Sequence, residues 1–185
     1  MAGKSRRSDP VSGQRRRPEG LCLAAPDRRL SRQIITSGVA VVTATDTDGH
    51  LHGLTLTSVT SLSLSPPLFL ACLADSSETL GAVLRSGGFC INYLAQSQRA
   101  ISDVFATRSG AKFRNVAHRI RPSGQVEIAG ALAVIECTLH ERLQAGDHSI
   151  VIGRPVAMHG GDEEPLIHFR GAYRRIGAPL PPAAA

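Results

Sequence analysis

The sequence has 185 residues, 42% of them hydrophobic, and a formal net charge of +6 at pH 7. This length favours one domain with a real core over two, and every apolar stretch falls far short of the roughly 20 residues of a membrane-spanning helix. The basic N-terminus lacks the continuous apolar run of a secretory signal, so we expect a cytoplasmic protein without a membrane-spanning segment.

The positive charge lies at the N-terminus. Residues 1–32 carry nine Lys and Arg against three acidic residues, whereas the remainder has twelve of each. Residues 1–27 are rich in Gly, Ser, Pro and Arg, so we predict a disordered basic leader ahead of a folded domain over residues 28–176. Nucleic-acid binding by this leader is the less favoured alternative, because the folded part is neutral.

The first half of the chain alternates short strands with short helices. Helices are indicated by apolar residues at helical spacing, two of them behind Ser or Asp caps, over residues 28–36, 78–85 and 96–106. Strands are indicated by β-branched and apolar runs between turn residues, over residues 39–45, 51–60, 61–64, 68–74 and 89–94.

The second half begins with a polar, irregular segment, residues 107–125, which we predict to be a long functional loop. Three strands follow, and a tail rich in Pro and Ala ends the chain; these segments cover residues 131–143, 149–158, 166–173 and 177–185. There is no βαβ alternation and no repeat of fixed period. The pattern predicts a mainly β protein with short helices, built as a closed antiparallel barrel, because closure removes exposed strand edges.

Cysteines and histidines give no metal-binding pattern. The four cysteines are too widely spaced for a CxxC site, namely Cys22, Cys72, Cys90 and Cys137. Three of them lie in apolar runs, so we expect free, mostly buried thiols. His50 and His52 alternate in a predicted strand and have no acidic or thiol partner close in sequence, so no metal site is expected.

An uncharged row of hydroxyl side chains lies between Gly53 and Leu68. Its members are Thr55, Thr57, Ser58, Thr60, Ser61, Ser63 and Ser65. A solvent-exposed strand face is one interpretation of this row. An exposed face normally carries Lys or Glu, however, whereas uncharged hydroxyls beside Leu and Val suit a flat, neutral ligand rich in heteroatoms.

Two further segments are candidates for ligand contacts. Residues 75–79 lie at the junction between a predicted strand and a predicted helix, and the free amide groups and dipole of a helix start bind phosphate well. Arg108 or Lys112 could supply a cation; plain helix capping is the alternative. His148 lies on a predicted turn, so it either contacts a nicotinamide or is only a turn residue.

The common nucleotide and nucleophile motifs are missing. No GxGxxG follows a strand, and the sequence contains neither a GxxxxGK[ST] phosphate loop nor a GxSxG nucleophile elbow. A Rossmann-type dinucleotide site is therefore disfavoured, and any redox cofactor has to be held in another way.

Taken together, eight short segments resemble the flavin reductase-like family with the FMN-binding split-barrel fold, in particular the reductase components of actinomycete polyketide and phenol monooxygenases. The segments occur in family order between about residues 30 and 176. They are residues 38–43, 53–68, 77–79 and 89–94, Phe105 with Lys112 and Phe113, residues 136–138, residues 146–148 with Gly153, and residues 169–173.

The resemblance implies a closed, six-stranded antiparallel split barrel with Greek-key topology and a role for each matching residue. The residues implied to line the isoalloxazine ring are Gly53, Thr55, Thr57 and Ser58. The ribityl chain would be flanked by Cys72, Leu73 and Ala74, and the phosphate held by Ser77 and Thr79. The residues implied to close over the flavin are Phe105, Lys112 and Phe113. The nicotinamide would be received by His148, Phe169, Arg170 and Gly171.

The resemblance also implies the activity. A flavin reductase of this kind passes hydride from NADH or NADPH to FMN or FAD without a catalytic side chain, and a separate flavin-dependent monooxygenase receives the reduced flavin by diffusion. Such barrels pair into homodimers with the flavin near the interface. A non-catalytic carrier of flavin or heme on the same barrel is the alternative.

Overall fold

The computed structural model describes residues 35–180 of the chain. The basic leader expected over residues 1–27, including Cys22, and the end of the tail lie outside these residues. The helix expected over residues 28–36 also lies outside them, apart from residues 35 and 36, which are not helical. Across residues 35–180, no helix is both long and apolar enough to cross a membrane.

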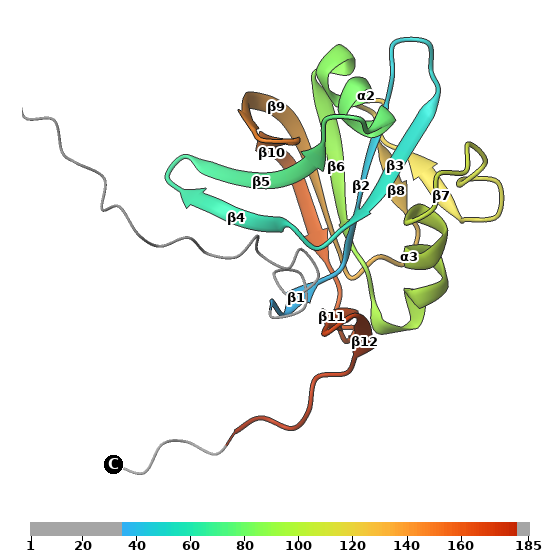
Figure 1. Cartoon of the computed structure of the whole chain (residues 1–185), viewed down its shortest axis with the longest axis vertical. Coiled ribbons are helices and arrows are strands. Elements are labelled where there is room, and N and C mark those ends of the chain that lie inside the picture. Colours follow the sequence, from blue (N-terminus) through green and yellow to red (C-terminus); the bar gives the residue numbers. More distant parts are fainter. Residues whose placement is uncertain (1–34, 181–185) are drawn as a thin grey trace, which may run out of the picture.

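Seven strands form one antiparallel sheet in the order β3-β2-β6-β9-β10-β5-β4 (Figure 1). Their bounds are β2 Ala40–Thr45, β3 Leu51–Leu56, β4 Val59–Leu64, β5 Pro67–Ala74, β6 Gly88–Tyr93, β9 Ala133–Ala145 and β10 His148–Gly160. The mainly β architecture expected from the sequence is therefore confirmed. Among the described strands no pairing joins β3 to β4, although only Thr57 and Ser58 separate these two edge strands in sequence.

Two smaller sheets flank the large one. One contains β1 Ser37–Gly38, β11 Ile167–Phe169 and β12 Ala172–Arg174, and the other contains β7 His118–Ile120 and β8 Val126–Ile128. The single strand expected over residues 166–173 is wrong, because Arg170 and Gly171 have positive φ angles of 53° and 75°. Two consecutive residues of this kind form a hairpin turn. The irregular segment expected over residues 107–125 is likewise interrupted by β7.

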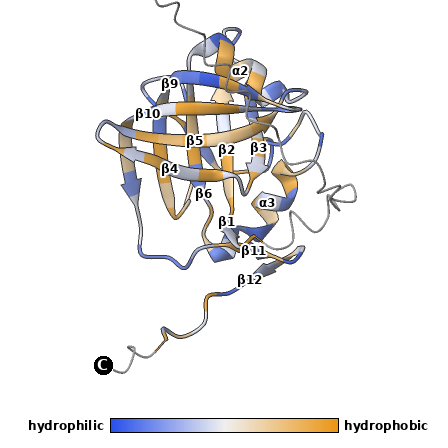
Figure 2. Ribbon diagram, turned by 60° about the vertical axis from the view of Figure 1, so that its left-hand side comes forward, coloured by the Kyte–Doolittle hydropathy of each residue, from blue (hydrophilic) through white to orange (hydrophobic). Residues whose placement is uncertain are grey.

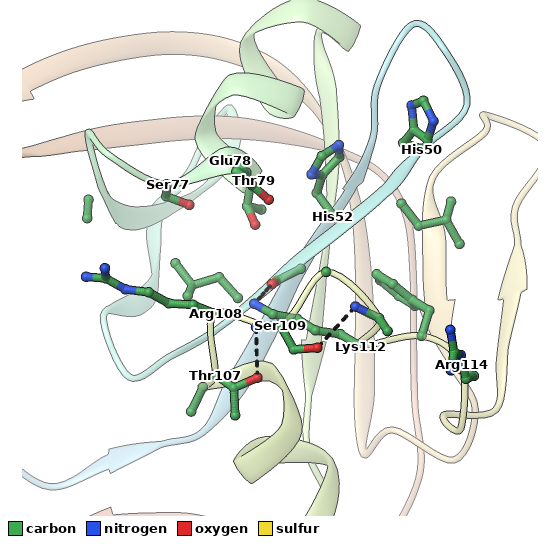
Figure 3. A pocket seen from close by; sticks show the side chains of 18 of the residues that line it. His50, His52, Ser77, Glu78, Thr79, Thr107, Arg108, Ser109, Lys112 and Arg114 are labelled. Carbon is green, nitrogen blue, oxygen red and sulfur yellow. Dashed lines mark hydrogen bonds between the residues drawn. The ribbon is translucent and has the colours of Figure 1, made fainter.

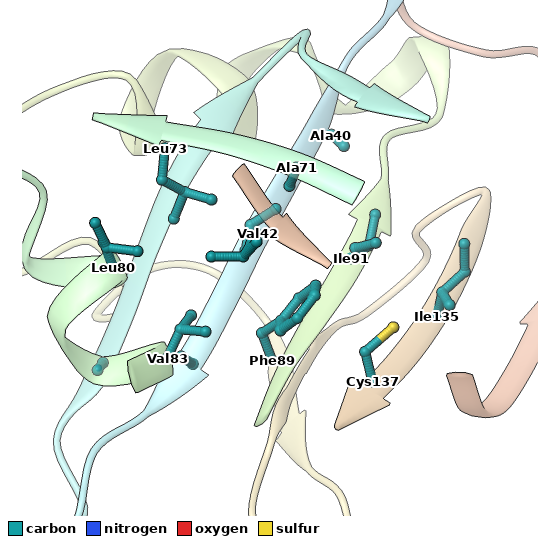
Figure 4. Packing of buried hydrophobic residues seen from close by; sticks show 13 residues of the cluster. Ala40, Val42, Ala71, Leu73, Leu80, Val83, Phe89, Ile91, Ile135 and Cys137 are labelled. Carbon is teal, nitrogen blue, oxygen red and sulfur yellow. The ribbon is translucent and has the colours of Figure 1, made fainter. Parts of the chain in front are cut away.

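The helices cover the sheet with apolar residues. Helix α2 (Glu78–Ser86) begins at its N-cap Ser77 and ends at Gly87, whose φ of 70° is the left-handed conformation that glycine adopts easily. Leu80 and Val83 of α2 pack into the main core, which also contains Phe89 of β6 (Figure 4). A short 3-10 turn, η1 (Gln96–Gln98), leads into α3 (Arg99–Phe105).

Strand β2 is buried on both faces and separates two cores. Ala40, Val42 and Ala44 belong to the main core, whereas Val39, which precedes the strand, and Val41 face a second core with Phe105 and Ile128. Because successive strand residues point to opposite faces, a continuous apolar run is required here, and Figure 2 shows the apolar residues along the strands. The two cores fix the helices and loops that surround the candidate site.

Candidate functional site

A pocket of about 890 Å³ opens between β3, the start of α2 and the loop that follows α3 (Figure 3). Its walls come from three segments far apart in sequence, residues 50–54, residues 74 and 76–79, and residues 106–114. The volume lies within the range of about 300 to 1,000 Å³ that small-molecule and cofactor sites occupy. The first part of the predicted functional loop, residues 107–114, does line a pocket.

The start of helix α2 forms one wall of this pocket. Ser77 has extended backbone angles, and its hydroxyl oxygen accepts a hydrogen bond from the amide of Leu80 at 3.4 Å. Thr79 is buried and Ser77 is half-buried, and both line the pocket together with Glu78. The first amides of a helix have no partner within the helix, so this wall presents donors to an anion.

Lys112 connects the loop to the opposite wall. Its ammonium group donates to the carbonyl oxygens of Gly53 at 2.9 Å and of Phe105 at 3.3 Å. Partial burial lowers the pKa of Lys112, and the nearby charge of Glu78 opposes that shift. The side chain is therefore fixed in place while its charge remains available to the pocket.

Gly53 permits a close approach of aromatic rings to β3. A Cβ atom at this position would lie 2.5 Å from Cε1 of Phe105 and 3.3 Å from Cζ of Phe113. The two rings contact each other edge to face, with centroids 4.9 Å apart. Only a glycine leaves room for Phe105 here, so the wall of the pocket depends on this residue.

Asp46 supports the histidines at the edge of the pocket. Its carboxylate accepts hydrogen bonds from the ring Nε2 of His52 at 2.9 Å and from the backbone amides of Asp48 and His50. These bonds, led by the one from His52, lower the pKa of Asp46 to about 2. The expectation that His50 and His52 have no acidic partner close in sequence is wrong, because the turn after β2 folds Asp46 back onto both.

Asp46, Asp48 and His50 also offer ligand atoms within 4.8 Å of one another. The guanidinium of Arg85 lies 3.7 Å from the same Asp46 carboxylate. A metal ion at this turn would face a competing cation, and the arrangement is explained by the hairpin turn itself.

A polar network holds Asp75, which lies two residues before the N-cap Ser77. The amide of Asp75 donates to the carbonyl of Asp147 at 3.0 Å, and the Asp75 carboxylate accepts from the hydroxyl of Ser149. Arg142 donates to that hydroxyl at 2.9 Å and lies 3.5 Å from Asp75. Strands β9 and β10 thereby hold the turn that carries Ser76 and Ser77.

The flavin reductase like domain family matches residues 30–177 of this sequence. The chain belongs to this family. A flavin reductase of Pseudomonas putida is 40% identical over 145 residues, which cover 77% of this chain and 84% of that protein. The reductase subunit of a flavin-dependent monooxygenase of Rhodococcus jostii (strain RHA1) is 36% identical over 76% of this chain and 72% of its own length.

Structural comparison agrees with the sequence comparison. An NADH:FAD oxidoreductase of Streptomyces globisporus C-1027, solved in complex with NAD and FAD fragments, is 31% identical with a TM-score of 0.76, over 85% of this chain and 96% of that one. The chain spans only 44% of another relative, a probable flavin reductase of Rhizobium meliloti (strain 1021) that is 39% identical over 137 residues.

The pocket of this flavin reductase-like chain brings together part of the predicted flavin site. The predicted residues that line it are Gly53, Ala74, Ser77, Thr79, Lys112 and Phe113, with Arg108 as the second predicted cation. Leu73 and Phe105 are fully buried in the two cores, and Phe105 contributes to the wall from behind Gly53.

The remaining predicted ring contacts lie beside the pocket rather than in its walls. The Thr55 hydroxyl donates to the carbonyl of Ser102 at 2.8 Å. Thr57 and Ser58 are exposed at the corner between β3 and β4, where Ser58 donates to the carbonyl of Cys72 at 3.1 Å. Cys72 is half-buried, and Cys90 and Cys137 are buried, as expected for these three thiols.

The predicted nicotinamide contacts fall in two places. His148 pairs with the pocket residue Ala74 across β10 and β5 but is not itself among the residues that line the pocket. Its ring is 2.7 Å from the Asp147 carboxylate. Phe169, Arg170 and Gly171 form the turn of the β11–β12 hairpin, which lies at the other end of the molecule from α2 (Figure 1).

Several pocket residues carried no signal in the sequence. They are Thr107, Ser109 and Arg114, together with His50 and His52, which were considered only as metal ligands; Ser76 and Glu78, in contrast, belong to the predicted phosphate segment, residues 75–79. A solvent-facing arginine or serine in a loop has no periodicity or motif of its own. Only the polar character of residues 107–125 pointed to this wall, and it pointed to the segment rather than to single residues.

Proposed function

We propose that this chain is an NAD(P)H-dependent flavin reductase, which transfers hydride from NADH or NADPH to FMN or FAD and supplies reduced flavin to a separate monooxygenase. One observation carries the proposal: the pocket combines a capped helix start with cationic side chains, in a chain that belongs to the flavin reductase like domain family. An anionic, phosphate-bearing cofactor fits this chemistry.

The flavin phosphate is proposed to bind at Ser77 and Thr79, with Lys112 and Arg108 neutralising its charge. From there the ribityl chain runs past Ala74 and the backbone of Leu73 and Cys72 toward the corner between β3 and β4. The isoalloxazine ring is placed at this corner, where Thr57 and Ser58 are exposed and uncharged. Gly53 and Thr55 support it from β3.

When bound, the flavin and the nicotinamide supply the hydride chemistry themselves, so the protein needs no catalytic side chain. The residues of this chain would bind the flavin and the nicotinamide and orient the two rings. Hydroxyl and amide groups near Thr57 and Ser58 stabilise negative charge that develops next to them, as fixed dipoles do in an oxyanion hole. A site of a few neutral hydrogen bonds without a covalent link also allows release of the reduced flavin to a monooxygenase by diffusion.

A homodimer completes the proposed site. The corner that would carry the ring is open in one chain, and the strand that follows it exposes Leu62 and Leu64, the latter to 89%. His148 and the turn at Phe169–Gly171 are proposed nicotinamide contacts at opposite ends of one chain, so a second subunit has to bring them to one flavin. The sheet is proposed to close as a split barrel at this corner, and the protein to act in the cytoplasm.

The test is a steady-state assay of NADH and NADPH oxidation with FMN and with FAD, together with anaerobic bleaching of the visible flavin absorbance. Rapid nucleotide oxidation that depends on added flavin is expected. Flavin binding without bleaching would contradict the reductase and would favour the non-catalytic carrier.

A further inference from the structure

The pocket carries more positive charge than one phosphate requires. Its ionisable lining consists of one carboxylate, Glu78, and five basic side chains, namely His50, His52, Arg108, Lys112 and Arg114. Within residues 35–180, neither arginine of this set nor Lys112 forms an ion pair with a protein carboxylate. A cavity lined by unpaired cations is a site for anionic groups.

These basic side chains are distributed along the pocket. Arg108 lies on the side of Ser77, at the start of α2, whereas His50 and Arg114 lie at the opposite end (Figure 3). His52 and Lys112 lie between the two ends. A single phosphate at the helix start reaches Ser77 and its neighbours, and it leaves the cations of the far end without an anion.

The far end of the pocket is also structurally supported. The Asp46 carboxylate, whose side chain is only 7% exposed, accepts the ring Nε2–H of His52. Because a carboxylate can only accept, this bond fixes the orientation of the imidazole. In the protonated form of the ring, the Nδ1–H group can then donate to an anion in the pocket. Asp46 also binds the backbone amide of His50 at 2.9 Å, so one carboxylate positions both histidines.

We propose that His50, His52 and Arg114 form a second anion subsite, which binds the phosphate on the adenylate side of FAD, and that FAD is therefore the preferred flavin. This inference rests on the proposed function, because it assumes that the first flavin phosphate binds at Ser77. The pocket volume of about 890 Å³ accommodates a dinucleotide arm, since the ring itself is placed outside, at the corner between β3 and β4.

Equilibrium binding of FMN, FAD and riboflavin to the full chain, followed by flavin fluorescence, provides the first test. The wild-type protein is expected to bind FAD about tenfold more tightly than FMN, the gain of roughly one charge-assisted contact. The difference should narrow as the salt concentration rises, because exposed charges are screened. Equal affinities for FMN and FAD at low salt would overturn the proposal.

A double variant, His50→Gln with Arg114→Met, tests whether these two residues form the second anion subsite. The dissociation constant of FAD is expected to rise about tenfold, while that of FMN stays within about twofold. Arg175→Met, which removes an exposed arginine beyond β12, is the matched control and should change neither constant. A double variant that weakens FMN and FAD equally would show that these residues hold the shared phosphate, against the proposal.

The second anion subsite could be occupied by a phosphate of the pyridine nucleotide instead of FAD, and the same double variant distinguishes the two ligands. If the double variant raises the KM for NADPH, leaves that for NADH unchanged and keeps FAD binding intact, the subsite serves the ribose phosphate of NADPH and the proposal is wrong. Adenosine monophosphate should compete with FAD in the wild type and not in the double variant. Failure of the proposed function gives a different result, in which no flavin binds and no nucleotide is oxidised.

Discussion

Two groups of charged side chains in this molecule are organised in opposite ways. In the first, between β7, β8 and β9, Arg121 lies 3.3 Å from both Glu127 and Glu136, and Arg119 lies 2.7 Å from Glu127. His159 lies 3.3 Å from the same carboxylate. In the second group, the pocket, five basic side chains face one carboxylate.

The difference separates charge that supports the fold from charge that is available to a ligand. The Glu127 and Glu136 side chains are almost completely buried, and a buried carboxylate without a cation is costly. Their partners therefore hold the β7–β8 hairpin on the large sheet. Within residues 35–180 Arg108, Lys112 and Arg114 of the pocket pair with no carboxylate, so removing them should affect binding and leave folding nearly intact. His50 and His52 differ, because both lie against the buried Asp46 carboxylate.

Arg121→Met should have the largest effect, because it removes the cation shared by two buried carboxylates. We expect the free energy of unfolding to fall by about 3 kcal/mol, measured by denaturant titration. Arg119→Met is the matched control: its side chain is more exposed than that of Arg121, so a loss below about 1 kcal/mol is expected. Equal losses in the two variants would contradict the assignment of Arg121 as the shared partner.

Gly53→Ala tests whether the pocket wall depends on packing as well as charge. The added Cβ would lie 2.5 Å from Phe105, so we expect a loss of about 1–3 kcal/mol from overpacking and a weaker affinity for both flavins. Gly110→Ala is the control for stability, because a Cβ there meets nothing within 4 Å. A Gly53→Ala protein with wild-type stability and affinity would rule out this description of the wall.

Lys112→Met removes a pocket cation that makes no ion pair within the described part of the chain, residues 35–180. We expect the dissociation constants of FMN and FAD to rise together by about tenfold, whereas the unfolding free energy changes by only about 1 kcal/mol through two lost backbone contacts. Fluorescence titration and denaturant titration measure the two quantities on the same sample. If Lys112→Met lost as much stability as Arg121→Met, the pocket cations would support the fold in the same way as the charges around Glu127 and Glu136, and the distinction between the two groups would be wrong.

Ser58→Leu places a bulky side chain at the exposed corner that is proposed to carry the isoalloxazine ring. Because Ser58 is exposed, the stability should change by less than about 0.5 kcal/mol, while the affinity for riboflavin, FMN and FAD falls by a similar factor of about five. Thr60→Leu, on the same exposed strand, is the comparison. Normal flavin affinity in Ser58→Leu would show that the ring is placed wrongly.

Asp46→Asn is distinguished from the other variants by a pH signature in its stability. The pKa of Asp46 is lowered from 3.8 to about 2 in the folded protein, so its contribution to stability is full above the unfolded value and is lost as the pH falls through about 2. The variant should therefore be less stable than the wild type at neutral pH, and the two should converge in acid. Asp162→Asn, at an exposed position, should show no such convergence.

Elements with a strong local signal could be predicted from the sequence. Helix α2 was expected over residues 78–85 with Ser76 and Ser77 as candidate caps, and it runs over Glu78–Ser86 with Ser77 as its cap. The continuous apolar run of β2 was recognised as a strand, and its burial on both faces explains the run. In both places the residues that decide the conformation are neighbours in sequence.

Elements whose conformation depends on residues far away in the sequence could not be predicted in this way. Phe169 to Tyr173 has the pattern of one strand, yet Arg170 adopts a positive φ because the chain turns back at this point to pair β11 with β12. The bonds from Ser149 and Arg142 to Asp75 join residues about seventy positions apart. Neither the turn at Arg170 nor the contacts of Asp75 with Ser149 and Arg142 are indicated by a local sequence pattern.

The sequence by itself determined the mainly β composition, the capped helix and the set of short segments that mark the flavin reductase family, since propensity, capping and motifs are properties of adjacent residues. The tertiary structure alone decided which side chains share the pocket. Pairing of β3 with β2, the contact of Lys112 with Gly53, and the support of Asp75 by β10 bring together segments separated by up to seventy-four positions. That assembly follows from burial of two cores over the whole chain, and no short window of sequence contains it.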